Sequence, residues 1–399
     1  MNKKFFSLIA LLTVIIGLIF TEGCSSEVNL SENKNDVVDI SNDSNDNNID
    51  GQLIFDYSLE LEYANNFAVD FYKGGYIIFK DIENEQDYLI IPENKSVPKE
   101  VPEEIKILYA PINNLYVDSS AMVSLLSSFD GGLDSLKLVT NEKDNWYLEN
   151  VAYAMESGKI KYAGKYNSPD YEMLLENNVQ LCICTTMIYS NPDVSEKFNE
   201  LGIPYLVENS TKENHPLARM EWMKLMGIIS GKEESAANTF NRQQEIIESI
   251  SSQVSDMSDA DIKVAIFYYT NDGSKVYLRN SEDYIAKMLQ LAGGVYIAED
   301  LQPGESGTTA MTLEEFFKIV SEADYIFYMN YYAKFTKLDE FISFNEINKD
   351  LKAVQNKKVW YTSPDFSQKA NALGDIISDM NKILMSDENI DTDYLIYMK

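Results

Sequence analysis

The stretch KEESAANTFNRQQEIIESISSQV (232–254) decides the fold, because it is a long helical segment with similar patterns on both sides of it. Before this stretch, short apolar runs alternate with amphipathic segments, and after it the same alternation resumes. Apolar strands that alternate with helices indicate parallel, doubly wound sheets. The sequence therefore predicts two α/β lobes that are joined by a single long helix.

The expected elements can be placed along the chain. In the first lobe we expect strands at 105–111, 136–140, 179–186 and 203–209, and helices at 119–129, 146–157, 170–177, 191–201 and 215–229. In the second lobe we expect strands at 262–270, 324–330 and 357–363, and helices at 281–292, 312–323 and 369–385. Ahead of both lobes, the short runs at 67–72, 74–81 and 87–93 are separated by glycine or charged turns, which is typical of an antiparallel meander.

The N-terminus predicts export. Lys3 and Lys4 precede an apolar run over residues 5–20, and Gly23-Cys24 follows shortly after. A cysteine directly after a small residue resembles a bacterial lipobox, so we expect Cys24 to be lipidated and the chain to be anchored outside the cell membrane. A plain cleaved signal and an uncleaved anchor remain alternatives. Residues 25–51 are rich in Ser, Asn and Asp, which predicts a flexible tether.

These patterns divide the chain into six expected parts. They are a signal peptide (1–23), a tether (24–52), a β-meander elaboration of the first lobe (53–100), an N-terminal α/β lobe (101–231), an inter-lobe helix (232–256) and a C-terminal α/β lobe (257–399).

Composition excludes several functions. The chain of 399 residues has 33 Lys+Arg against 64 Asp+Glu, a formal net charge of −31, which argues against a nucleic-acid partner. One His and three Cys argue against a structural zinc cage and against His-dependent catalysis. We therefore expect no enzyme activity, no cofactor and no metal held by the protein itself. Cys182 and Cys184 lie in an apolar strand, and we expect buried free thiols on opposite faces of the sheet.

Six stretches in order resemble a known family. The chain is similar, over roughly residues 105–385, to the substrate-binding lipoproteins of ABC importers for iron-siderophores, haem and cobalamin, the class III periplasmic binding proteins. The resemblance implies a monomer that binds a metal chelate between two lobes bridged by a rigid helix and delivers it to a permease dimer. It is carried by YAGKYNSPDYEMLLENNVQLCICTT, LGIPYLV, ENHPLARMEWMKLMGIISGKEESAANTF, LRNSEDYIAKMLQLAGGVYIAEDL, MTLEEFFKIVSEADYIFYM and LKAVQNKKVWYTSPDFSQ.

Two glutamates match the family's docking positions. In the family, an exposed Glu at the start of a helix in each lobe pairs with arginines of the permease. Glu172 follows Asp170, a predicted N-cap, and Glu314 follows Thr312, which is expected to form a capping box with Glu315. The resemblance implies that Glu172 and Glu314 dock, with Glu315 as an alternative to Glu314. A plain helix-dipole role remains the other interpretation.

The ligand pocket is expected where strands end, because doubly wound folds bind ligands outside the carboxyl ends of their strands. The candidates are Tyr116, Tyr166, His215, Arg219 and Trp222 in the first lobe, and Arg279, Tyr331, Trp360 and Phe366 in the second. Alternatively, Arg219 pairs with Glu213 or Glu221, and Trp222 and Trp360 are core residues.

Guanidinium groups beside aromatic walls suit an anionic metal chelate and favour a ferric siderophore. Haem and corrinoids remain alternative ligands. Two other classes also remain: an enzyme on the related nitrogenase-type lobe architecture, and a surface-interaction or sensory lipoprotein with no role in transport.

Overall fold

The computed structural model describes residues 52–255 and 261–399. The predicted signal peptide, Cys24 and nearly all of the tether lie outside the described residues. None of the helices within the described ranges is both long enough and apolar enough to cross a membrane.

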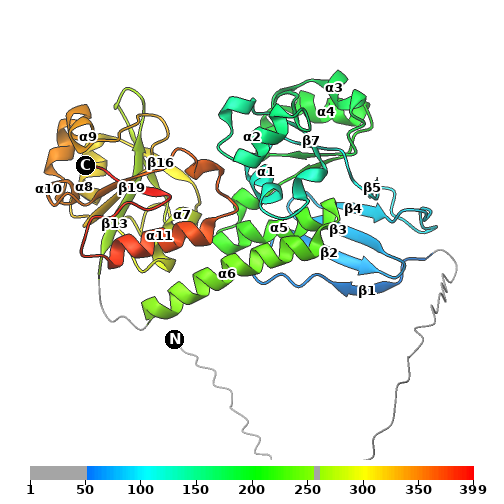
Figure 1. Ribbon diagram of the computed structural model, residues 1–399, viewed down its shortest axis with the longest axis horizontal. Coiled ribbons are helices and arrows are strands. Elements are labelled where there is room, and N and C mark those ends of the chain that lie inside the picture. The colour runs from blue at the N-terminus through cyan, green and yellow to red at the C-terminus, as the bar shows by residue number, and fades with distance from the viewer. Residues whose placement is uncertain (1–51, 256–260) are drawn as a thin grey trace, which may run out of the picture. The chain divides into compact units, whose positions relative to one another are not determined.

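A five-stranded N-terminal sheet precedes the lobes (Figure 1). Strands β1 (Phe55–Ser58), β2 (Phe67–Tyr72), β3 (Tyr76–Asp81) and β4 (Gln86–Ile91) form the predicted antiparallel meander. The fifth strand, β5 (Lys106–Tyr109), adds parallel to β4. The expectation that this strand begins the sheet of the first lobe is therefore wrong, because β5 pairs with β4 of the N-terminal sheet instead. Residues 92–105 form the long connection that two parallel neighbouring strands require.

The first lobe is built on a parallel sheet with the strand order β12-β11-β6-β7-β8. Its first strand along the chain is the three-residue β6, which the sequence pattern did not reveal. The strands are β6 (Leu115–Val117), β7 (Leu136–Val139), β8 (Lys161–Tyr162), β11 (Leu181–Cys184) and β12 (Tyr205–Val207). Four helices alternate with them: α1 (Ser120–Ser127), α2 (Glu149–Glu156), α3 (Tyr171–Glu176) and α4 (Pro192–Glu200).

The second lobe has a mixed sheet rather than a purely parallel one. Its order is β16-β14-β13-β17-β18-β19, with β15 also pairing with β13. The predicted parallel strands are β13 (Lys263–Tyr269), β17 (Tyr325–Tyr328) and β18 (Val359–Thr362). A further parallel strand, β15 (Val295–Tyr296), was not predicted. Three strands pair antiparallel to their neighbours: β14 (Val276–Arg279), β16 (Thr308–Met311) and β19 (Leu395–Tyr397). The helices are α7 (Tyr284–Leu291), α8 (Leu313–Val320), α9 (Leu338–Phe344), α10 (Lys352–Gln355) and α11 (Leu373–Met385).

The long helix α6 (Glu233–Ser255) joins the lobes and lies beside α5 (Pro216–Ser230), the last helix of the first lobe (Figure 1). Gly231 ends α5 in the left-handed conformation, with φ of 66°. Gly227 lets the helices approach closely, because a Cβ atom built there would lie 2.5 Å from the Cβ of Ala236. The single long helix between two α/β lobes is confirmed.

Two buried carboxylates fasten the N-terminal segment to α5. Glu221 accepts hydrogen bonds from the backbone N–H groups of residues 62, 63 and 64 at 2.8–3.0 Å. Glu213, just before α5, accepts from the backbone N–H groups of Asn65 and Asn66 and from the indole of Trp222. Both side chains are buried, and Lys224 pairs with Glu221 at 2.7 Å. The loop before β2 is therefore held by charge-assisted bonds rather than by apolar packing alone.

Replacing Glu221 by Ala should lower the free energy of unfolding by about 3 kcal/mol, because it leaves three buried or partly buried N–H groups without their partner. Urea denaturation measures the change. The exposed Glu176→Ala is the matched control and should shift stability by less than about 0.5 kcal/mol. Equal stability of the two variants would contradict the assigned role of Glu221.

Candidate ligand-binding cleft

A cleft of about 610 Å³ opens at the carboxyl ends of the strands of the first lobe. Asp118 follows β6, Thr140 follows β7, Thr185 follows β11 and Glu208 follows β12, and all four line it. Ser367, from the second lobe, also lines the cleft. Both the position and the size are those of a small-molecule site in a doubly wound fold, for which volumes of about 300–1,000 Å³ are usual.

The first-lobe wall of this cleft contains two carboxylates with raised pKa values. Burial raises the pKa of Asp118 to about 7, although its Oδ1 accepts a 2.6 Å hydrogen bond from the backbone N–H of Thr185. Burial also raises the pKa of Glu208, which accepts from the hydroxyl of Ser119 at 2.8 Å and from both the N–H and the hydroxyl of Ser210. This wall therefore combines acidic groups and hydroxyls, and the charge of Arg219 acts to lower the pKa of Glu208.

Arg219 lines the cleft and also contacts the second lobe. It projects from α5 and lines the cleft, and its guanidinium carbon lies 3.9 Å from the ring centroid of Tyr284 on α7 of the second lobe. The alternative partners considered from the sequence, Glu213 and Glu221, are instead occupied by the N-terminal loop. Arg219 thus remains available at the cleft.

Polar contacts also join the lobes beside the cleft. The side chain of Gln368 donates to the carbonyl of Asn145 at 2.7 Å and accepts from the N–H of Tyr147 at 2.9 Å. The N–H of Asn371 donates to the hydroxyl of Ser124 at 3.3 Å. The short 3-10 helix Phe366–Gln368 and the residues that follow it therefore bring the second lobe against the first.

Tyr166 and Arg219 are the two predicted residues that line the cleft. Tyr166 lies at the tip of a hairpin formed by β9 (Gly164–Lys165) and β10 (Ser168–Pro169). Gly164 has a φ of +83°, and a Cβ there would lie 2.5 Å from the carbonyl oxygen of Ser168. The glycine is thus required for the turn that presents Tyr166.

Three predicted pocket residues are core residues, so the expectation that they contact ligand is wrong. Tyr116, Trp222 and Trp360 are each 0% exposed. Tyr116 points into the first-lobe cluster around Phe198, Trp222 packs on Phe67, and the indole of Trp360 donates to the carbonyl of Ile390. Large aromatic side chains gain most by complete burial, which explains their placement.

His215 and Phe366 are not among the residues that line the cleft. His215 is the N-cap of α5: its Nδ1 accepts from the N–H of Leu217 at 3.1 Å, and its ring stacks on Tyr63. Partial burial and the nearby Lys287 lower the pKa of His215, which favours the neutral ring that this cap requires. Phe366 is buried next to the cleft residue Ser367.

Arg279 and Tyr331 meet at the carboxyl end of the second-lobe sheet. Arg279 pairs with Asp283 at 3.5 Å and donates to the hydroxyl of Tyr331 at 3.4 Å. Tyr268, at the end of β13, packs its ring against both Tyr331 and Tyr277. The cleft residues Asp118 and Glu208 were missed from the sequence. Asp118 follows β6, a strand that was not predicted, whereas Glu208 lies near the end of the predicted strand 203–209 and gave a usable signal.

The two predicted docking glutamates have the expected local geometry. Asp170 caps α3 by accepting from the N–H of Met173, and Glu172 is exposed in the first turn. Thr312 and Glu315 form the predicted capping box on α8. Glu314 has a side chain that is 82% exposed and pairs with Lys318 at 2.9 Å. The docking role itself stays a prediction.

Cys182 and Cys184 are free and buried, as expected. Both pack in the same cluster, so the expectation of opposite faces is wrong, because residues two apart in a strand share a face. Across residues 52–255 and 261–399, no group of three or more His, Cys, Asp or Glu side chains is placed to hold a metal ion.

The chain belongs to the periplasmic binding protein family, whose pattern it matches over residues 134–366. It is 25% identical over 391 residues to an uncharacterized lipoprotein of Methanocaldococcus jannaschii, covering 94% of this chain and 92% of that one.

Solved structures share the fold. A periplasmic heme binding protein of Pseudomonas aeruginosa has a TM-score of 0.56 at 12% identity, covering 72% of this chain and 98% of that one. The TroA-like periplasmic binding protein FepB of Veillonella parvula has a TM-score of 0.54 at 14% identity, covering 72% and 95%. The siderophore periplasmic binding protein from the fuscachelin gene cluster of Thermobifida fusca has a TM-score of 0.52 at 18% identity, covering 69% and 97%.

The raised pKa of Asp118 predicts a stability that depends on pH. Because the folded protein binds this proton more tightly than the unfolded chain, the contribution of Asp118 to the free energy of unfolding falls as pH rises from about 4 to about 7. Asp118→Asn should remove this fall and gain of the order of 3 kcal/mol relative to the wild type over that interval. Denaturation at several pH values tests this, and parallel pH profiles of the two proteins would show that Asp118 titrates normally.

Proposed function

We propose that this protein is the substrate-binding lipoprotein of an ABC importer. It captures a metal chelate between its lobes, outside the cell membrane, and delivers it to a dimeric permease. Cys24 anchors it by a lipid, and it acts as a monomer through binding rather than catalysis. The observation that carries the proposal is the cleft at the carboxyl ends of the first-lobe strands, which is lined by Tyr166, by Arg219 and, from the second lobe, by Ser367.

A ferric siderophore is the first candidate for the ligand. Arg219 offers a guanidinium that is not paired with Glu213 or Glu221, and Tyr166 offers an aromatic wall that is 38% exposed. Such groups suit a flat or chelate-rimmed anion. Two of the fold neighbours are named as siderophore- and heme-binding proteins, which supports a chelate of this kind.

A corrinoid is the second candidate, and one observation favours it. Asp118, with the buried Glu208 behind it, places a carboxylate at the same cleft, where it can accept hydrogen bonds from amide groups on a corrin rim. An anionic siderophore would be repelled by these groups when they are ionised. The balance between Arg219 and the two acids therefore decides between the candidates.

Titration of the purified protein with ferric siderophores, haem and cobalamin should give binding for one class, read by quenching of Tyr and Trp fluorescence. Arg219→Ala and Tyr166→Ala should each weaken that binding at least about tenfold, because each removes a direct contact. The exposed Tyr153→Ala, on α2, is the control and should bind normally. Absence of binding by all three classes would reject the proposed substrate.

The double variant Glu172→Ala, Glu314→Ala should abolish uptake of the ligand by cells, because it removes the carboxylates proposed to pair with permease arginines. Affinity of the purified variant for the ligand should stay unchanged, since both residues are exposed away from the cleft lining. The control pair Glu176→Ala, Glu322→Ala should support normal uptake. A double variant with normal uptake would disprove the docking assignment.

A further inference from the structure

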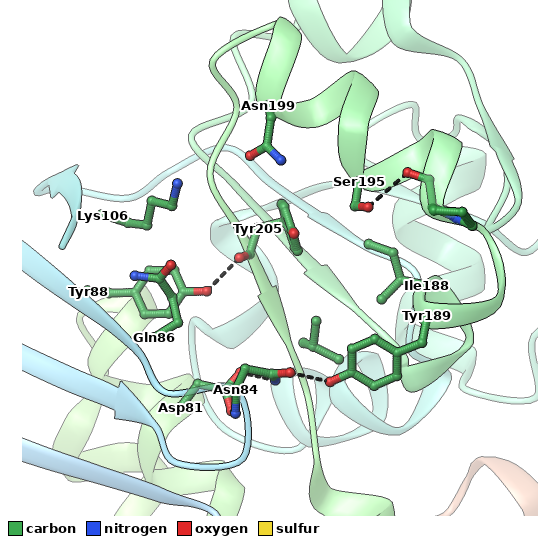
Figure 2. Close-up of a pocket in the computed structure, with 12 residues that line it drawn as sticks. Asp81, Asn84, Gln86, Tyr88, Lys106, Ile188, Tyr189, Ser195, Asn199 and Tyr205 are labelled. Atoms are coloured by element: carbon green, nitrogen blue, oxygen red, sulfur yellow. Dashed lines mark hydrogen bonds between the residues drawn. The ribbon is translucent and has the colours of Figure 1, made fainter. Parts of the chain in front are cut away.

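A second cavity of about 480 Å³ lies between the N-terminal sheet and the first lobe (Figure 2). It shares no lining residue with the ligand-binding cleft. The sheet contributes Asp81, Asn84, Gln86, Tyr88 and Lys106, and the lobe contributes Tyr189, Asn199 and Tyr205 among others. The sheet lies outside the segment that matches the family, residues 134–366. This cavity is therefore a product of the N-terminal elaboration.

Hydrogen bonds hold part of the wall in place. Asp81 is 2% exposed, and both its oxygens accept from amide groups: Oδ1 from the Nδ2 of Asn209, and Oδ2 from the Nδ2 of Asn84 at 2.6 Å. The hydroxyl of Tyr189 donates to Asn84, and the hydroxyl of Tyr88 donates to the carbonyl of Tyr205, both at 2.5 Å (Figure 2). The two halves of the cavity are thus joined directly.

Other polar groups of the wall are uncommitted. Gln86 uses its Nε2 to donate to two backbone carbonyls, of Asp87 and Glu104, which leaves its Oε1 as an acceptor. Within the described ranges, no side-chain hydrogen bond or ion pair engages Lys106 or Asn199. Both residues line the cavity, and Figure 2 shows Lys106 on the strand of the sheet and Asn199 on the helix of the lobe, both above Gln86 and Tyr88 in this view. The cavity therefore offers a ligand three uncommitted groups: the ammonium of Lys106 as a donor, the Oε1 of Gln86 as an acceptor, and the amide of Asn199 as both donor and acceptor.

The chemistry of this wall selects the class of ligand. Amides and hydroxyls that both donate and accept match vicinal hydroxyl groups, which do the same. The rings of Tyr189 and Tyr205, which are not fully buried, provide flat apolar surfaces against which the C–H face of a sugar can pack. Lys106 is the single cation of the lining, which is too little for a phosphate-rich ligand, and the many polar groups do not suit a lipid.

We propose that this cavity is a binding site for a small carbohydrate, a mono- or disaccharide. Lys106, Gln86 and Asn199 hydrogen-bond the hydroxyl groups, and the tyrosine rings pack against the ring face of the sugar. The site is separate from the chelate cleft, so the protein can hold both ligands at once.

Saturation-transfer NMR on the purified protein with glucose, galactose, mannose, N-acetylglucosamine, maltose and trehalose tests the proposal. At least one sugar should give a signal at millimolar concentration. Its Kd should rise at least about tenfold in the double variant Lys106→Ala, Asn199→Ala. Asn199→Trp, which places a bulky side chain from an exposed position, should abolish the signal. Arg219→Ala, at the chelate cleft, should bind the sugar as the wild type does.

Three outcomes would overturn the carbohydrate site. No signal from any of the six sugars would do so, and so would a signal that both cavity variants leave intact. A signal lost in Arg219→Ala but kept in Asn199→Trp would place the sugar in the chelate cleft instead. Since chelate binding is measured separately by fluorescence, failure of one site leaves the test of the other unaffected.

Discussion

The packing of α5 against α6 is the contact on which the rest of the molecule depends. The close approach of Gly227 to Ala236 sets the distance between the helices, and Gly231 turns the chain between them. From α5, Glu221 holds the N-terminal loop while Arg219 reaches the cleft and Tyr284 of the second lobe. A change in the tilt of α5 would thus move the N-terminal sheet, the cleft and the contact between lobes together.

This arrangement limits how the lobes can move. The long helix α6 resists a wide hinge opening, whereas several lobe contacts beside the cleft are polar. Gln368 and Asn371 each bond to groups of the first lobe, and Arg219 stacks on Tyr284. Individual hydrogen bonds of this kind contribute about 1 kcal/mol. Because α5 also packs on α7 and α11 of the second lobe within one apolar core, these interactions together favour a small opening about a rigid base.

The sequence predicted features that depend on local pattern and failed on those that depend on distant partners. The long helix, the capping box of Thr312 and Glu315, and the cap at Asp170 follow from neighbouring residues. Strand β6 was missed because three residues carry too little periodicity. Tyr116 and Tyr166 were equally good aromatic candidates from the sequence, but Tyr116 is buried in the core, whereas Tyr166 lies at a hairpin turn and lines the cleft. The clamp of Glu221 on residues 62–64 joins segments far apart in sequence, so no local pattern could show it.

The N-terminal sheet also covers an exposed edge strand of the first lobe. Strand β12 is an edge of the parallel sheet, paired only with β11, and an exposed edge invites pairing with other chains. The hydroxyl of Tyr88 satisfies the carbonyl of Tyr205 on that edge, and the β3–β4 hairpin covers it from one side. Because a side chain rather than a strand covers the edge, the sheet and the lobe do not close completely. The proposed carbohydrate cavity occupies the space that remains between them.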